Sequence, residues 1–313
     1  MKIRLTRSCC CFLQIALVIG AVAHPTYSFA EKKSAKADRD INAIGHRVIG
    51  YPTGPNNWYS LTKEEELGTR VSAAFEKSVP LLRDSVTESY LDRLLHVIGQ
   101  NSDAKLPITI RVIDSDESYA VTLLGGHQYL TRGLLLELQN EGELAAAIAR
   151  GVAHTALRSA TGELTRVELI NLTSLPPISV GPQGVANSTA GWGLGIPLAV
   201  LSFRRKDESS GDYFGIQYLY KSGYAPECFI SFVQKVWPPS ASTTSQAFSP
   251  FPPLQERLKV LQKEIRRLLP AQSEAITDTA DFESFRKHMA GLPPPKPLPK
   301  RPILIRSDSQ ESN

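Results

Sequence analysis

The sequence predicts an α+β fold that is mostly helical and contains a small β-sheet. Three observations predict it: several long segments place apolar residues at helical spacing, one short segment alternates apolar and polar residues, and one carries β-branched and aromatic residues on both sides of a glycine pair. With 42% hydrophobic and 21% charged residues among 313, the chain has the composition of a globular protein with a sizeable core.

Two amphipathic helices are expected in the first third of the chain. Residues 63–79 and 87–99 each place apolar side chains on one face, at intervals of three and four residues. Residues 107–113 then alternate apolar and polar side chains, which predicts a half-buried strand. Residues 119–131 contain Gly125-Gly126 between two strand-like runs, which predicts a hairpin.

The second half of the chain is expected to be helical. Residues 141–158 are Ala-rich, acidic at their start and basic at their end, an arrangement that the helix dipole favours. Further helices are expected over 204–222, 225–237 and 253–269. The segment 173–197 is rich in Gly, Pro, Ser and Thr, yet apolar. Two interpretations of it stay open: a lid or surface-lying segment, with membrane association through 173–201, and a helical hairpin with a disordered tip.

Residues 1–30 have the pattern of a secretory signal peptide. Three basic residues come first, a nearly uncharged run follows over 9–23, and Ser28-Phe29-Ala30 offers small residues for cleavage. The apolar run of about 15 residues is shorter than the roughly 20 that span a bilayer as a helix. We therefore expect export to the periplasm or cell envelope, with a retained N-terminal anchor as the alternative.

Two segments that flank the predicted helices and strands are expected to lack regular structure. Residues 31–60 are expected to be an extended lead-in, and 291–313 a proline-rich, basic, disordered tail.

The charge, the cysteine content and the motifs argue against several classes of function. Without the leader the formal charge falls from +4 to +1, so the chain lacks the strong positive charge that is typical of nucleic-acid-binding proteins. Removal of the leader leaves Cys228 as the single cysteine, so no internal disulfide can form. No Gly-rich phosphate loop, GxSxG elbow or CxxC pair occurs.

Several short blocks follow one another in a specific order. They are Asp114-Ser-Asp-Glu117, Gly125-Gly126, Thr131-Arg-Gly-Leu-Leu135, Glu143-Leu-Ala145, Ala149 to His154, Glu208-Ser-Ser-Gly-Asp212 and Ser222-Gly-Tyr-Ala-Pro226. In order and spacing these blocks resemble metallopeptidase family forty-eight, which contains the CAAX prenyl proteases and bacterial periplasmic enzymes of outer-membrane quality control. The resemblance spans 39–290 and implies a zincin-like domain there, with the edge strand of its sheet beside the HExxH helix.

The family's chemistry depends on residues that this chain has partly replaced. In the family, the two HExxH histidines and a later glutamate bind zinc, and the HExxH glutamate deprotonates the zinc-bound water. The resemblance places Arg150-Gly151-Val152-Ala153-His154 at that motif. It makes His154 and Glu208 vestigial ligands and Asp212 the carboxylate that would orient a histidine. Arg150 stands at the first ligand, and Gly151 stands at the general base.

These replacements predict a site without metal or catalysis. A guanidinium has no lone pair to give a cation, and its charge would repel each unit charge of a metal ion by about 3–4 kcal/mol. We expect Arg150 to pair with Glu208, and with Asp212 as a further partner; the alternative is an Arg150 that points to solvent. No cofactor is expected, and no catalytic residue.

The leading hypothesis is therefore a pseudoenzyme of the cell envelope: a proteolytically inactive homologue that binds peptides or proteins as a chaperone-like or regulatory module. Envelope or outer-membrane proteins are the expected partners. One alternative is an active zinc metalloendopeptidase with a non-standard site, in which His127 or water replaces the lost groups. Another is a decaying paralogue with no role.

Overall fold

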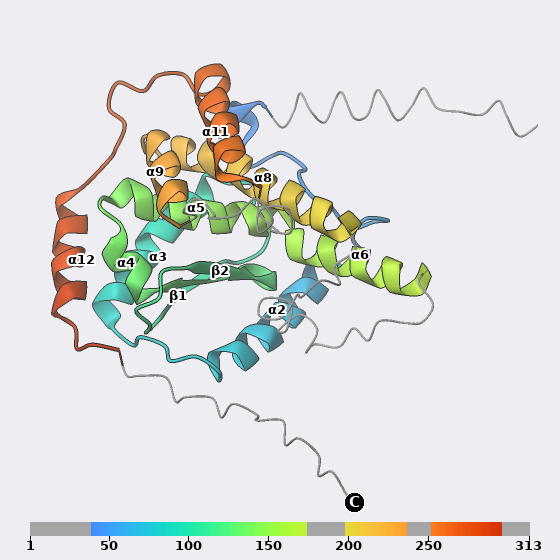
Figure 1. Cartoon of the computed structure of the whole chain (residues 1–313), viewed down its shortest axis with the longest axis horizontal. Coiled ribbons are helices and arrows are strands. Elements are labelled where there is room, and N and C mark those ends of the chain that lie inside the picture. The colour runs from blue at the N-terminus through green and yellow to red at the C-terminus, as the bar shows by residue number, and fades with distance from the viewer. Residues whose placement is uncertain (1–38, 174–197, 237–251, 296–313) are drawn as a thin grey trace, which may run out of the picture. The chain divides into compact units, whose positions relative to one another are not determined.

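The computed structural model describes residues 39–173, 198–236 and 252–295 (Figure 1). The residues from Ile41 onward form one structural unit. Its elements are η1 (Ile41–Ala43), α2 (Leu61–Glu76), α3 (Ser85–Gln100), β1 (Thr109–Ile113), β2 (Ala120–Leu123), η2 (Leu124–Gly126), β3 (His127–Thr131), α4 (Arg132–Glu137), α5 (Glu141–Leu157), α6 (Ser159–Thr173), α8 (Leu198–Lys221), α9 (Glu227–Val236), α11 (Leu254–Leu268) and α12 (Ala280–Gly291).

Several helices begin at a side chain that caps them. Ser60, Asp84, Asn140 and Thr279 each accept a hydrogen bond from the backbone N–H three residues later, at the starts of α2, α3, α5 and α12. Such a cap satisfies one of the N–H groups that a helix leaves without a partner in its first turn. The starting points of these helices are therefore encoded locally.

The sheet has three strands in the order β1-β3-β2. Central β3 runs parallel to β1 and antiparallel to β2, so β2 and β3 form the predicted hairpin. Between them Gly125 and Gly126 adopt φ angles of 78° and 85°, a backbone region that glycine enters without steric cost. Figure 1 shows the sheet between α5 on one face and α2 on the other.

Helix α5 lies at the centre of the core, and every residue along it except His154 is buried. Helices α3, α8 and α9 pack around it, while α11 rests on α8 and α9. An α+β, zincin-like fold with a small sheet beside this helix is what the sequence predicts, and the prediction is confirmed. No helix within the described ranges is long and apolar enough to cross a membrane.

Among the described α-helices, α4, α6 and α12 were not predicted from the sequence. Arg158, in the left-handed region at φ 55°, ends α5 and separates it from α6, which starts at the next residue. The described part of the lead-in, residues 39–60, is mostly irregular, and Arg47 anchors it: its side chain donates to the buried Asp103 at 2.6 and 2.9 Å. The leader 1–30, nearly all of segment 173–197, and most of the tail 291–313 lie outside the described residues.

Candidate functional site

The residues expected at the former metal site come together where α5 crosses α8. Arg150 and His154 are four residues apart on α5, and Glu208 and Asp212 are four apart on α8, so each pair shares one helix face. Two glycines of α8 face α5 at the crossing. A Cβ added at Gly215 would lie 3.1 Å from Cα of Arg150, and a Cβ added at Gly211 would lie 2.4 Å from Nε2 of His154.

The guanidinium of Arg150 binds both carboxylates of α8. Its Nε donates to Oδ1 of Asp212 at 3.1 Å, and its Nη2 donates to Oε2 of Glu208. The Arg150 side chain is 11% exposed, the Asp212 side chain 3% and the Glu208 side chain 23%. The pairing expected from the sequence is therefore present, and the alternative of an Arg150 that points to solvent is wrong.

Arg257 on α11 is a member of this cluster that the sequence reasoning missed. Its Nε and Nη2 donate to the two oxygens of Asp212 at 2.7 and 2.8 Å, in the bidentate arrangement that suits a guanidinium and a carboxylate. A signal for it existed in the sequence. Arg257 interrupts the apolar stripe of α11, four residues before Leu261, and a charged residue on a core-facing stripe needs a buried partner.

Burial and the neighbouring charges set the protonation states at the crossing. Burial lowers the pKa of His154 to about 3, and the positive charges of Arg150 and Arg257 act in the same direction, so its imidazole is neutral. Burial raises the pKa of Glu208, while Arg150 opposes this rise. Burial also disfavours the charged form of Arg150, but the two carboxylates outweigh it and raise the pKa of its guanidinium.

Gly151 faces Gln128 of β3, which the sequence reasoning also missed. A Cβ added at Gly151 would lie 2.5 Å from Cδ of Gln128 and 2.6 and 2.8 Å from its amide oxygen and nitrogen. The Gln128 side chain therefore lies against the bare backbone at the position that the resemblance assigns to the general base. Only the tertiary packing of β3 on α5 shows this contact.

His127 lies on the other face of the sheet. Side chains alternate along a strand, and Gln128 points toward α5, so its neighbour points away. His127 Nδ1 lies 3.0 Å from Oγ1 of Thr109, and its charged neighbours are Glu76 and Arg111. The alternative in which His127 replaces a lost zinc ligand is therefore contradicted, because the side chain does not face Arg150 and His154.

The residues present do not fit a zinc ion. His154 and Glu208 could each offer a lone pair, and Nε2 of His154 lies 3.9 Å from Oε2 of Glu208. The guanidinium of Arg150, however, already holds the Glu208 carboxylate and has no lone pair of its own. Within the described ranges no group of three or more His, Cys, Asp or Glu side chains could hold a metal ion.

The profile of Peptidase family M48 matches residues 85–265, more than half of the chain. The chain belongs to peptidase family M48. The match runs from α3 to α11 and so includes both helices of the crossing.

The chain is similar to curated proteins named beta-barrel assembly-enhancing protease. The beta-barrel assembly-enhancing protease of Escherichia coli (strain K12) is 26% identical over 196 residues, which cover 59% of this chain and 39% of that protein. The protein of this name from Yersinia pestis is 26% identical over 185 residues, or 56% of this chain and 38% of its own length. The match thus spans about two fifths of these relatives.

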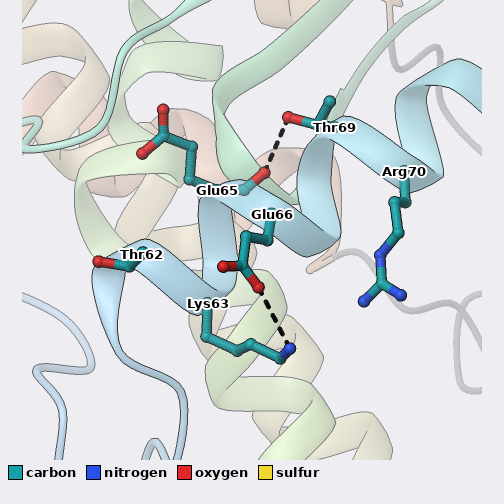
Figure 2. A pocket seen from close by; sticks show the side chains of 6 residues that line it. All are labelled: Thr62, Lys63, Glu65, Glu66, Thr69 and Arg70. Carbon is teal, nitrogen blue, oxygen red and sulfur yellow. Dashed lines mark hydrogen bonds and ion pairs between the residues drawn. The ribbon is translucent and has the colours of Figure 1, made fainter.

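A shallow hollow lies apart from the helix crossing, on the surface of α2 (Figure 2). Its lining comes from a single helix: Thr62, Lys63, Glu65, Glu66, Thr69 and Arg70. Lys63 pairs with Glu66 at 3.2 Å, and the Thr69 hydroxyl donates to the backbone oxygen of Glu65. Both contacts are local to α2, and none of the lining residues belongs to the helix crossing.

Proposed function

We propose that this chain is an M48 homologue of the bacterial cell envelope that has lost peptidase activity and binds polypeptides without cleaving them. The observation that carries the proposal is the guanidinium of Arg150, held by Glu208 and Asp212 where the family places its metal. An internal cation in that position leaves the carboxylates satisfied, so the fold needs no ion to balance them.

The loss of catalysis follows from the groups that hydrolysis requires. In a zinc metallopeptidase, the metal acidifies the attacking water and a base takes its proton. Arg150 can bind neither metal nor proton, and Gly151 has no side chain. His154 remains as a neutral imidazole, 14% exposed, with no carboxylate at residue 151 to work beside it.

Peptide binding is supported by the position of β2 at the edge of the sheet. An edge strand offers backbone N–H and C=O groups with which an extended peptide can pair. Thr131 donates its N–H to the carbonyl of Tyr119, so the alternating pattern of an antiparallel ladder turns the backbone groups of Ala120 and Thr122 away from β3. These two residues would contact an added strand.

Two measurements on the purified chain test the loss of activity. Metal content by mass spectrometry should show no stoichiometric zinc, and an unfolded protein substrate should stay intact with or without added zinc. A chain that holds one zinc per molecule and cleaves the substrate in a chelator-sensitive manner would establish the alternative, an active zinc metalloendopeptidase, and would overturn the proposal.

The binding activity is tested with a matched pair of variants at the edge strand. Thr122→Pro removes the outward N–H and should weaken binding of a fluorescent, extended β-barrel peptide, whereas Thr122→Val keeps the backbone and should bind like the wild type. Equal binding by both variants would remove β2 from the proposal. The named role of the relatives in β-barrel assembly motivates this probe, and the leader predicted over 1–30 supports an envelope location.

A further inference from the structure

Gln128 is a buried polar side chain that takes no part in the ion pairs at the crossing of α5 and α8. It lies at the centre of the sheet on β3, is 2% exposed, and reaches the bare backbone of Gly151 on α5. Neither its amide oxygen nor its amide nitrogen has a hydrogen-bond partner among the described residues. A buried amide without partners costs free energy, so shape and not hydrogen bonding must account for its fit in this place.

Gly151 is equally unusual as a buried glycine in the middle of a helix. Glycine there costs about 1 kcal/mol relative to alanine, and α5 otherwise uses alanine at most of its small positions. No alanine could replace it without a shift, because the new Cβ would lie 2.5 Å from Cδ of Gln128. The position of the Gln128 side chain therefore requires a glycine at residue 151.

We infer that Gln128 and Gly151 form a matched pair in which the glutamine side chain fills the room that a general base on α5 would occupy. The site is then closed by shape as well as by charge: Arg150 takes the place of the cation, and Gln128 takes the place of the carboxylate. This inference deepens the proposed function and, where zinc is concerned, rests on it.

A consequence is that two substitutions alone should restore zinc binding less well than the same two combined with a smaller residue at position 128. Arg150→His supplies the first ligand, but Gly151→Glu would push its Cβ into the Gln128 amide. To remove this overlap the Gln128 side chain would have to move, although it is packed against α5 and only 2% exposed. Packed interiors resist added atoms of this kind.

A double-mutant cycle on thermal stability tests the pair without any metal. In the wild-type background Gly151→Ala should lower Tm, because the added methyl overlaps Gln128. In the Gln128→Val background the same substitution should raise Tm by about 2–4 °C, as expected for glycine to alanine in a helix. Gln128→Ala serves as a second background if the valine variant does not fold.

The matched control is Gly99 on α3, where an added Cβ meets no atom within 4 Å. Gly99→Ala should change Tm equally in the wild-type and Gln128→Val backgrounds. An effect of Gly151→Ala that is the same in both backgrounds would overturn the inference, whatever the metal content of the wild-type chain. The outcome of this cycle therefore does not depend on whether the chain has lost peptidase activity.

Zinc titration then tests the functional consequence. The triple variant Gln128→Val with Arg150→His and Gly151→Glu should bind zinc with a Kd at least tenfold lower than the double variant that keeps Gln128. Equal affinities, measured by calorimetry on folded samples of similar Tm, would show that Gln128 does not restrict the site.

Discussion

Replacing Arg150 by methionine should destabilise the protein by about 3 kcal/mol. Breaking a buried ion pair from one side costs about 3–5 kcal/mol, because it leaves a charge without compensation. Here the cost lies at the low end of that range for two reasons. Asp212 keeps both hydrogen bonds from Arg257, and the unpaired Glu208 side chain is 23% exposed. For a domain of this size the loss corresponds to a fall in Tm of roughly 6–12 °C.

Urea denaturation monitored by circular dichroism measures this change. Lys63→Met removes a surface pair, Lys63 to Glu66, whose side chains are 53% and 59% exposed, and should cost less than about 0.5 kcal/mol. The double variant Arg150→Met with Glu208→Gln should recover most of the stability, since the uncompensated charge is gone. If Arg150→Met is no more harmful than Lys63→Met, the guanidinium does not hold the crossing together and the reasoning is wrong.

Three further predictions concern the same region. Gln128→Met should raise the free energy of unfolding by about 1–3 kcal/mol in urea denaturation, because it removes two buried amide atoms without partners; a loss of stability would contradict this. Between pH 6.5 and about 3 only the unfolded chain protonates His154, so stability should fall as pH falls, by up to about 1.4 kcal/mol per pH unit, and His154→Gln should lessen that slope. Excess EDTA should leave Tm unchanged; a clear fall would reveal a bound metal that stabilises the fold.

The parts of the fold that sequence patterns predicted are those with strong local signals. The apolar face of α3 and the glycine pair of the hairpin are examples, as is the Ala-rich α5. Helix α12 carried a usable signal, since Phe282, Phe285 and Met289 recur at helical spacing and are all buried. Helix α6 has weak apolar periodicity, and the six residues of α4 are too few to show any.

The site was predictable to the extent that charge and spacing determine it. Arg150 and the pair Glu208 and Asp212 are opposite charges on helices that the family likeness brings together, and the ion pairs follow from that. The contact of Gln128 with Gly151 depends on which face of β3 packs on α5. Alternation along a strand separates His127 from Gln128, but it does not say which of the two points inward.

The charges at the crossing explain how the fold can persist without a metal. Arg150 and Arg257 contribute two positive charges, Glu208 and Asp212 two negative ones, and His154 is neutral, so the cluster sums to zero. A divalent ion added beside Arg150 would leave the buried cluster with an excess of two positive charges and no ligand from residue 150. Removal of Arg150 would instead leave an excess of one negative charge, which a cation could balance. Retention of Arg150 therefore opposes the entry of zinc on electrostatic grounds, and the contact of Gln128 with Gly151 opposes the return of a general base by shape.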